Sequence, residues 1–310
     1  MAWVKTYARQ IPMRGLLDAV RILYHAACLV FDIHAAKHHV AKHRLNMKFL
    51  RQHIVLDAEK APRPSEVAPE DYKIWVLWWQ GEEQMPTIVK ATYHSIKEAS
   101  DKEVVLITKE NVGDFVQLPS YIAEKVKAGK ISLAALSDYI RVSLLYQYGG
   151  LWIDSTVLCA RKLPQELFES KLFTIKNRPS GEKYIAGGKW NVQVLGTNQI
   201  HNKVFFLMKS IFEQYWKKYS IIMDYLLVDY SFQYIYESDA ECKAAFDSIP
   251  MTNSRMHELL PVINNAFDFT QWENLLSSDT YLFKLTYKCQ FVEQQDGKDT
   301  YYSYFINIFR

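Results

Sequence analysis

Hydrophobic positions along this chain change period several times, and these changes predict alternating strands and helices. Short runs that are apolar on both faces are typical of buried strands, whereas apolar positions three and four residues apart indicate helices. From residue 72 the predicted order is a strand at 72–79, a helix from Met85, a strand at 103–108, a helix at 131–148 and a strand at Leu151–Ile153. Strands joined through helices form right-handed parallel units. The pattern therefore predicts an α/β fold with a mixed, mostly parallel sheet flanked by helices.

Further elements follow from the same pattern and divide the chain. The other predicted helices are at 12–56, 120–128, 204–219 and 220–236, and the other predicted strands are at 171–175, 191–195 and 281–288. Three prolines within 61–70 indicate a linker. We therefore divide the chain into a basic amphipathic helical extension (1–60), a linker (61–70), a main domain (71–290) and a C-terminal tail (291–310).

Charge is unevenly distributed over the 310 residues. Residues 1–60 hold ten Lys and Arg against four Asp and Glu, a net charge of +6, and because the whole chain carries +3 the remainder carries −3. Two interpretations of 1–60 stay open: a surface that contacts an anionic membrane or a partner, or a helical pair packed on the main domain with a solvated basic face. Nucleic acid is not an expected partner, because the main domain is slightly acidic and the basic helix lacks interleaved aromatic side chains.

The spacing of the cysteines and the absence of several known motifs exclude some classes of protein. The four cysteines include no CxxC pair, which argues against a zinc site or a disulfide framework and favours a reducing compartment. The apolar run at 16–31 contains Asp18, Arg21 and His25, so it is not expected to span a membrane, and no signal peptide is visible. GxGxxG and Walker patterns are absent, which argues against dinucleotide and ATP sites. We expect a cytoplasmic protein, peripherally associated with the inner face of the membrane under the first interpretation of 1–60.

The stretch Leu136–Leu158 concentrates the candidate chemistry. Asp138 and Arg141 are three residues apart, so they share one face of the predicted helix. Gly149 and Gly150 permit a tight turn, after which the short apolar strand ends at Asp154. Open α/β sheets bind ligands at the carboxyl ends of their strands. A carboxylate at this place suits a metal ion or a sugar hydroxyl.

Side chains elsewhere are candidates for binding a nucleotide. The first predicted strand carries three tryptophans that could stack on a base, although core packing is expected for two of them: Trp75, Trp78 and Trp79. Three polar residues alternate near the end of the chain and would point to one side of a strand: Lys284, Thr286 and Lys288. Two ammonium groups and a hydroxyl suit a diphosphate, and a solvated edge strand is the alternative.

Two carboxylates lie among bulky apolar residues in the helix predicted at 220–236. Burying an acid is costly unless it is paired. We therefore expect Asp224 or Asp229 to face a cleft, with helix capping or an ion pair as the alternative for each.

Three motifs together give the chain a family resemblance. They are Ile74-Trp75…Trp79-Gln80-Gly81, Leu136-Ser-Asp-Tyr-Ile-Arg141 and Tyr148-Gly-Gly-Leu-Trp-Ile-Asp-Ser-Thr156, with weaker echoes at 224–229 and 284–288. On these residues the chain resembles the capsular polysaccharide synthesis proteins, a branch close to glycosyltransferase family 32, and it shares a core pattern with the glucosylating clostridial toxins. The likeness covers roughly residues 72–290.

The resemblance implies a GT-A-like (Rossmann-type) fold and a nucleotide-sugar donor. It implies that Asp138 and Arg141 hold the donor sugar, and that Asp154 is the first acid of an Asp-x-Asp element holding ribose and a divalent metal, Mn²⁺ or Mg²⁺. Thr156 stands where the second acid is expected; its hydroxyl can ligate a metal but adds no charge, so the metal site at Asp154 and Thr156 should be weaker. The residues expected to bind the nucleotide sugar are Trp75, Trp79, Gln80, Gly81, Asp138, Arg141, Lys284, Thr286 and Lys288.

The expected function is therefore that of a glycosyltransferase. It would move a sugar from a nucleotide sugar, expected to be UDP-linked, to a growing capsular, exopolysaccharide or cell-wall glycan or a lipid-linked glycan, with retention of configuration at the anomeric carbon. The expected catalytic residues are Asp138, Arg141, Asp154 and Asp229, with Asp224 or Asp229 orienting the acceptor or stabilising the sugar cation. Because Thr156 replaces an acid, the alternative is an inactive sugar- or nucleotide-binding scaffold in a polysaccharide-assembly complex.

Overall fold

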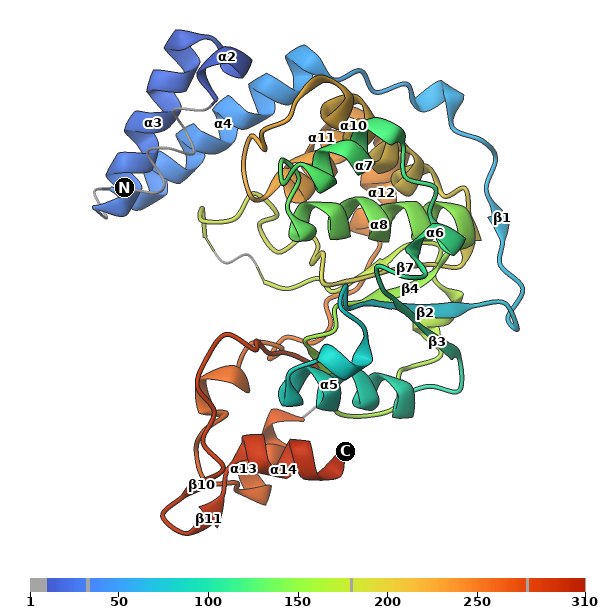
Figure 1. The fold of residues 1–310 in the computed structure, drawn as a ribbon, viewed down its shortest axis with the longest axis vertical. Helices are drawn as coiled ribbons and strands as arrows, with labels where there is room; N and C mark the ends of the chain where they lie inside the picture. The colour runs from blue at the N-terminus through green and yellow to red at the C-terminus, as the bar shows by residue number, and fades with distance from the viewer. Residues whose placement is uncertain (1–9, 32–33, 179–180, 277–278, 310) are drawn as a thin grey trace.

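A five-stranded mixed sheet forms the centre of the computed structural model, which describes residues 10–31, 34–178, 181–276 and 279–309 (Figure 1). The strands lie in the order β3 (Glu103–Ile107), β2 (Lys73–Leu77), β4 (Gly150–Ile153), β7 (Val194–Thr197) and β6 (Phe173–Thr174). β3, β2 and β4 are parallel, β7 runs antiparallel to β4, and β6 runs antiparallel to β7. The α/β fold with a mixed sheet flanked by helices, predicted from the sequence, is confirmed.

Helices cover both faces of this sheet (Figure 1). One face carries α6 (Val112–Phe115), α7 (Ser120–Lys127), α8 (Leu133–Tyr148), α10 (Lys203–Lys218), α11 (Leu227–Ser238) and α12 (Ala240–Asp247). The other face carries α5 (Thr87–Glu98), α9 (Glu166–Glu169), α13 (Phe269–Leu275) and α14 (Tyr301–Ile308). The described residues therefore form two hydrophobic cores separated by the sheet.

The strands supply both cores because successive side chains point to opposite faces. In β4, Trp152 packs into the core around α8, whereas Leu151 and Ile153 pack into the core around α5. In β2, Trp75 points to the α8 side and Ile74 to the α5 side. All five side chains are at most 1% exposed. This two-sided burial explains why these strands are continuously apolar in the sequence.

Three two-stranded pairings lie outside the central sheet, and the first two of them join segments that are distant in the sequence. They are β1 (Ser65–Glu66) with β8 (Gln199–Ile200), β5 (Val157–Cys159) with β9 (Leu282–Lys284), and β10 (Gln294–Gln295) with β11 (Lys298–Asp299). After the last pair, α14 places Tyr301 and Phe305 in the same core as α5. The segment 291–310 thus contributes buried aromatic side chains to the lower part of the molecule in Figure 1.

The N-terminal extension forms separate helices. α2 (Ile11–Arg14) ends before Gly15, whose φ of 77° interrupts the helix, and α3 (Leu16–Val30) and α4 (Ala35–His53) pack against each other. α4 also packs on α11, where the Nδ1 atom of His43 lies 2.7 Å from the Tyr230 hydroxyl. The single continuous helix predicted at 12–56 is therefore wrong in its continuity, while residues 1–9 of the extension lie outside the described residues.

Two other predictions differ from the structure in extent. The helix predicted at 220–236 begins only at Leu227, because the preceding backbone is held by tertiary bonds: the Gln10 amide donates to the carbonyls of Ile222 and Met223. The strand predicted at 281–288 ends at Lys284, and a turn follows in which the Lys288 N–H donates to the Thr286 hydroxyl. Beyond residue 284 the alternation of side chains is therefore lost.

Candidate active site

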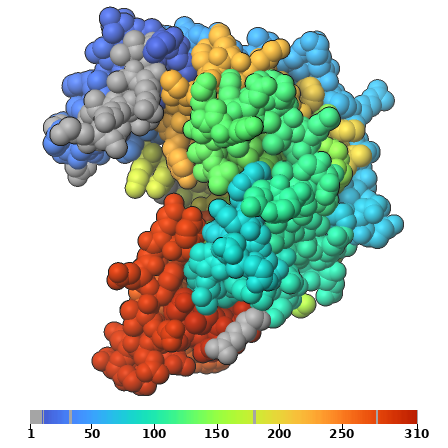
Figure 2. All heavy atoms as spheres, viewed as in Figure 1, coloured from blue at the N-terminus to red at the C-terminus, as the bar shows by residue number. Residues whose placement is uncertain are grey.

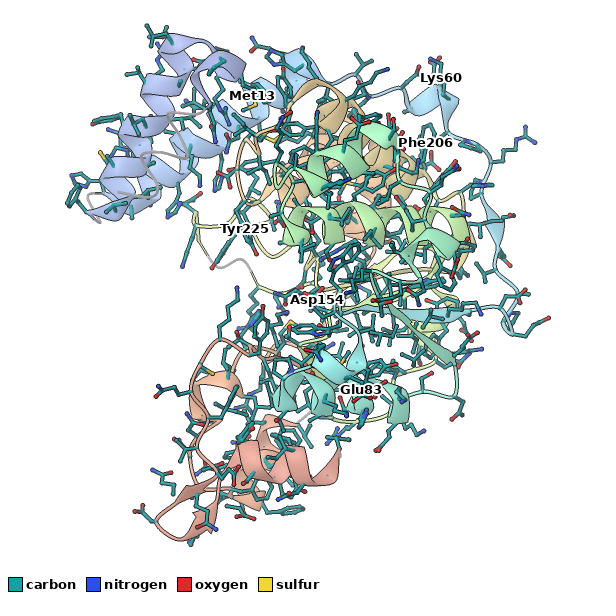
Figure 3. All side chains as sticks on the ribbon, in the orientation of Figure 1. Met13, Lys60, Glu83, Asp154, Phe206 and Tyr225 are labelled. Carbon is teal, nitrogen blue, oxygen red and sulfur yellow. The ribbon has the colours of Figure 1, made fainter. Side chains whose placement is uncertain are left out.

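A cleft of about 1470 Å³ opens at the carboxyl ends of β2 and β4. Its walls come from the loops after these strands, the first half of α8, and segments around residues 175–193, 222–229, 254–258 and 284–287. Small-molecule sites usually measure about 300–1,000 Å³, so this cleft has room for more than one substrate. Asp154 lies in the middle of the molecule and Tyr225 on the side of the N-terminal helices (Figure 3). Figure 2 shows the surface hollowed between the N-terminal helices and the C-terminal segment.

Local sequence positions α8 at this cleft. The Ser132 hydroxyl accepts a hydrogen bond from the Ala135 N–H and caps the helix start. At the other end Gly149 and Gly150 have φ of 66° and 96°, and the indole N–H of Trp75 donates to the Gly149 carbonyl at 2.9 Å. A Cβ atom at Gly150 would collide with the Lys73 carbonyl oxygen, so this position requires glycine. The glycine turn thereby connects α8 directly to β4.

Arg141 joins α8 to the end of β4. Its Nη2 atom lies 3.3 Å from Oδ1 of Asp138 and 3.4 Å from Oδ1 of Asp154, and its Nη1 donates to the Val192 carbonyl. The guanidinium carbon lies 4.9 Å from the ring centre of Trp152, a cation–π distance. The side chain is only 7% exposed, so one buried guanidinium holds two carboxylates at the cleft wall.

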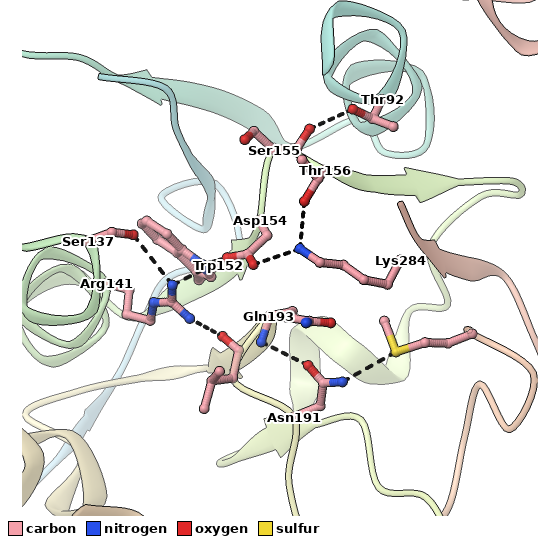
Figure 4. A network of polar contacts seen from close by, with 12 residues as sticks. Thr92, Ser137, Arg141, Trp152, Asp154, Ser155, Thr156, Asn191, Gln193 and Lys284 are labelled. Atoms are coloured by element: carbon pink, nitrogen blue, oxygen red, sulfur yellow. Dashed lines mark hydrogen bonds and ion pairs between the residues drawn. The ribbon is translucent and has the colours of Figure 1, made fainter. Parts of the chain in front are cut away.

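Asp154 is held by three neighbours, which Figure 4 shows together. Its Oδ1 accepts from the indole N–H of Trp152 at 2.9 Å, and its Oδ2 accepts from the Lys284 ammonium at 3.0 Å. The same ammonium donates to the Thr156 hydroxyl at 2.5 Å. The carboxylate predicted from the end of a buried strand is therefore fixed in orientation by Arg141, Trp152 and Lys284.

Strand pairing brings Lys284 to this position. β9 pairs antiparallel with β5, so that Lys284 lies opposite Val157, next to Thr156. The Lys284 N–H donates to the Met256 carbonyl at 2.8 Å, and the Leu285 N–H donates to the Thr156 carbonyl at 2.9 Å. The backbone on both sides of Lys284 is thus bonded, and its side chain is 19% exposed.

The three acids of the cleft, Asp154, Asp138 and Asp229, differ in the direction in which their surroundings shift their pKa. Burial alone would raise the pKa of Asp154, but Lys284 and Arg141 outweigh burial and hold the pKa below its ordinary value. Burial raises the pKa of Asp138 to about 7 despite Arg141, with Asp154 and Asp229 adding to the rise. Burial likewise raises the pKa of Asp229 to about 6, opposed by the hydrogen bond from the Trp190 indole at 3.0 Å. Asp154 is therefore the acid of the three whose ionised form is most favoured.

The expected divalent metal does not fit the side chains around Asp154 and Thr156 as they stand. Mg²⁺ and Mn²⁺ favour carboxylate and other hard oxygen ligands. Both oxygens expected to face the metal, Oδ2 of Asp154 and Oγ1 of Thr156, already accept from the Lys284 ammonium. In the part of the chain that the structure describes, no three His, Cys, Asp or Glu side chains form a group that could hold a metal.

The cleft collects most of the predicted binding residues. Trp79 and Gln80 line it together with Asp138, Arg141, Asp154, Thr156, Asp229 and Lys284. The neighbouring Trp78 lines it too, and its ring packs edge-on against Tyr287 with centroids 5.4 Å apart. These two rings, from segments over 200 positions apart, form an aromatic corner of the cleft, with Tyr287 three residues after Lys284 in the sequence.

Four of the predicted binding residues are not among the cleft-lining residues. Trp75 is fully buried and bonded to Gly149, so it is a core residue and cannot stack on a base. Gly81 lies between the lining residues Gln80 and Gln84 without lining the cleft itself, and its φ is 87°. Thr286 and Lys288 lie past the end of β9, where Tyr287 lines the cleft instead.

The two acids of the segment 220–236 have different roles. Asp229 faces the cleft, as expected for one of the pair. Asp224 instead accepts from the Lys42 ammonium at 3.0 Å and from the Asn46 amide at 3.2 Å, and its Oδ1 caps the following turn at the Leu226 N–H. Asp224 therefore joins α4 to the main body.

Several cleft residues were missed by sequence reasoning because they lie in irregular segments. They include Tyr184, Tyr225, Ser254, Arg255, His257 and Glu258. Tyr225 is 78% exposed and Tyr184 48% exposed, which is unusual for side chains of this size. Their only signal in the sequence is the neighbourhood of Asp224 and of the glycine pair at 187–188.

The sequence is similar to a family of known proteins and to one curated protein. A family model described as capsular polysaccharide synthesis protein matches residues 28–305. The O-glycosyltransferase PaGT of Phomopsis amygdali is 27% identical over 156 residues, which cover 42% of this chain and 38% of PaGT, so the chain spans well under half the length of this curated relative.

Two solved structures are similar at low scores. The PaToxG glycosyltransferase has a TM-score of 0.39 and 16% identity, with 66% of this chain and 82% of that chain covered. The apo structure of the bifunctional glycosyltransferase WbbM has a TM-score of 0.41 and 10% identity, with 78% of this chain and 50% of that chain covered.

Proposed function

This chain belongs to the capsular polysaccharide synthesis protein family, and we propose that it is a glycosyltransferase that moves a sugar from a nucleotide sugar to a glycan acceptor. The observation that carries the proposal is the meeting of Asp154 with Arg141 and Lys284 at the carboxyl end of β4. This is the edge of an α/β sheet where ligands bind. Buried charges of both signs around an open cleft suit a polar, anionic substrate.

The proposed donor is a UDP-linked sugar that lies across the cleft. Asp138 and Arg141 would hydrogen-bond the sugar hydroxyls, and Lys284 would contact the diphosphate. The aromatic corner of Trp78 and Tyr287 offers a ring surface for the base beside this diphosphate position. These groups come from three segments, namely α8, the loop after β2 and residues 284–287, so the donor would be held from several sides.

In the proposed reaction the bond between the anomeric carbon and the diphosphate oxygen breaks, and both electrons stay on the diphosphate. The acceptor hydroxyl oxygen forms the new bond to the anomeric carbon, and its proton passes to the departing diphosphate. The barrier falls where positive groups stabilise the leaving diphosphate and a carboxylate stabilises the cationic sugar. Lys284 and Arg141 are the two cations in contact with Asp154, and Asp229 is a further carboxylate that lines the cleft.

The proposed acceptor is a capsular, exopolysaccharide or cell-wall glycan, free or lipid-linked, and the proposed outcome is retention at the anomeric carbon. The exposed rings of Tyr184 and Tyr225 at the cleft support a glycan acceptor, because aromatic faces pack on the apolar faces of sugars. Proton NMR of the product distinguishes retention from inversion through the coupling of the anomeric proton.

We further propose that α3 contacts an anionic membrane surface. Its outward side and the residue after it expose large apolar side chains, which we call the α3 apolar face: Leu16, Leu17, Val20, Tyr24, Val30 and Phe31. Basic residues of α3 and α4 lie in the same hairpin, among them Arg21, Lys37 and Arg44. An apolar face next to basic groups suits an interfacial helix. No helix in the described ranges is long and apolar enough to cross a bilayer.

The test is incubation of the purified protein with a panel of nucleotide sugars and glycan acceptors, with release of nucleoside diphosphate as the readout. We expect turnover with at least one donor, and a loss of about 100-fold or more in Asp154→Asn, since one charged group at a transition state contributes on this scale. Asp101→Asn is the matched control, because Asp101 is fully exposed and outside the cleft. Donor binding without turnover would contradict the transferase and support the scaffold.

A further inference from the structure

The position expected for a divalent metal already contains a cation of the chain itself. The Nζ atom of Lys284 lies 3.0 Å from Oδ2 of Asp154 and 2.5 Å from Oγ1 of Thr156, the two oxygens predicted to ligate the metal. A metal that ligated both oxygens would lie next to this ammonium, and two positive groups at such a distance repel strongly. Lys284 and a metal therefore exclude each other at these two oxygens.

The backbone and the charged neighbours of Lys284 hold its ammonium group in place in the cleft. Lys284 is the last residue of β9, and main-chain bonds to Met256 and Thr156 fix the backbone around it. Its charge is balanced by Asp154, whose other oxygen faces Arg141 at 3.4 Å. Asp138, Asp154, Arg141 and Lys284 form one cluster, which carries two acids and two bases. Such a cluster needs no further cation to balance its acids.

Thr156 suits an ammonium better than it suits a metal. A hydroxyl accepts a hydrogen bond from a neutral or cationic donor but adds no negative charge to a metal site. A second carboxylate at this position would form a pair of negative charges with Asp154. Such a pair of carboxylates favours the binding of a divalent ion. A threonine at the position of the expected second acid and the Lys284 ammonium beside it therefore have one explanation, which is that the cation of this site is the ammonium and not a metal ion.

We propose that Lys284 is the resident cation of this active site, taking the place of a divalent metal between Asp154 and Thr156 and stabilising the diphosphate of the donor. This inference rests on the proposed function for the identity of the diphosphate. An ammonium has three N–H groups, and two of them are directed to Asp154 and Thr156. The third is available for a phosphate oxygen of a donor in the cleft. Sugar transfer by this protein is accordingly independent of added metal.

The experiment has one arm that needs no substrate. Titration of free Mn²⁺ followed by electron paramagnetic resonance measures metal binding to the wild-type protein and to the double variant Thr156→Asp, Lys284→Met. We expect binding by the double variant and at least a tenfold weaker affinity in the wild type. Addition of Asp154→Asn to the double variant should remove the binding. Mn²⁺ binding by the wild type that Asp154→Asn abolishes would overturn the inference, and so would a double variant that binds no more Mn²⁺ than the wild type.

A second arm measures transfer in the presence of a chelator. We expect the wild-type rate to be unchanged by EDTA within a factor of two, and Lys284→Met to lose about 100–1,000-fold, with Lys284→Arg recovering part of the loss. Lys162→Met is the control, because Lys162 is 71% exposed and lies outside the cleft. Loss of wild-type activity in EDTA that Mn²⁺ restores would overturn the inference.

The two arms separate the inference from the proposed function. A protein that transfers no sugar from any donor but shows the expected Mn²⁺ pattern would refute the transferase and leave the cation assignment standing. Thermal unfolding of each variant shows whether it folds. Lys284→Met keeps the length of the aliphatic stem, so it leaves little empty space beside Thr156.

Discussion

Lys284 and Asp154 are 130 positions apart in the chain, and yet the ammonium of one lies 3.0 Å from the carboxylate of the other. Asp154 directly follows the central strand β4, and Lys284 ends β9, which reaches this place by pairing with β5. The contact therefore joins the sheet edge to the C-terminal part of the chain. It also balances the charge of the acid on which the proposed chemistry depends.

The first prediction concerns the ionisation of Asp154. Replacing Lys284 with methionine should raise the pKa of Asp154, because burial remains while one of its two cations is lost. In the wild type the lowered pKa contributes stability above the pKa of the unfolded chain, and this contribution is lost as pH falls through the folded pKa. Lys284→Met should lose part of this stabilising contribution. Carbon NMR of the Asp154 carboxyl measures the pKa, and an unchanged value in the variant would refute the ion pair.

The second prediction concerns the pH dependence of stability at Asp229. Burial raises its pKa to about 6, so protonation of Asp229 favours the folded state. Its contribution is fully present below the unfolded pKa near 4 and is lost as pH rises through about 6. A shift of two units corresponds to about 3 kcal/mol at most. The difference in unfolding free energy between wild type and Asp229→Asn should therefore change by up to this amount between pH 4 and pH 8, with the wild type relatively more stable at pH 4.

Urea unfolding at several pH values measures this difference. Asp247→Asn serves as the control, because Asp247 is a half-exposed acid whose pKa is lowered by Lys243 rather than raised. A constant difference across this pH range for Asp229→Asn would contradict the burial argument.

The third prediction concerns the glycine turn between α8 and β4. Gly150→Ala should lower the free energy of unfolding by about 1–3 kcal/mol or more, because its φ of 96° is strained for alanine and the new Cβ would collide with backbone. Gly113→Ala in α6 is the matched control, since its surroundings are open within 4 Å and its φ is not positive. It should be neutral or stabilising by about 0.5–1 kcal/mol. Chemical denaturation of both variants tests this, and equal effects would refute the requirement for glycine.

The fourth prediction concerns the α3 apolar face. Leu17→Asp with Val20→Asp should lower binding to vesicles containing anionic lipid by about 100-fold, because each large apolar side chain contributes about 1.5–3 kcal/mol when buried. Flotation of the full chain with vesicles measures this. Val55→Asp is the control, because Val55 is 69% exposed but lies outside α3. Flotation that is equal for all three proteins would exclude the α3 apolar face as the contact.

The sequence allowed Asp138, Arg141 and Asp154 to be predicted as neighbours because their relationship is local. A helical face, a glycine turn and a buried strand bring the three together within 17 residues, and each of these signals lies in the residues themselves. The structure has the expected elements, with Arg141 in contact with both acids. Local pattern was sufficient for this part of the cleft.

The parts of the cleft around Lys284 and before α11 could not be predicted in the same way. The direction of Lys284 was expected from alternation along a strand, but Thr286 and Lys288 fall in the turn after β9. The contact of Lys284 with Thr156 depends on the pairing of β5 with β9, which periodicity does not specify. The segment before α11 depends on Gln10, which directly precedes α2, and on Lys42 of α4. Tertiary contacts of this kind override a local helical pattern.

A crystal structure of the protein with a bound UDP-sugar, grown in the presence of Mn²⁺, tests the central claim most directly. The account predicts a donor in the cleft with its sugar at Asp138 and Arg141. It also predicts that a diphosphate oxygen lies within about 3.2 Å of the Lys284 ammonium, which is a hydrogen-bond distance. A donor bound elsewhere, or a Mn²⁺ ion between Asp154 and the diphosphate with Lys284 displaced, would contradict it.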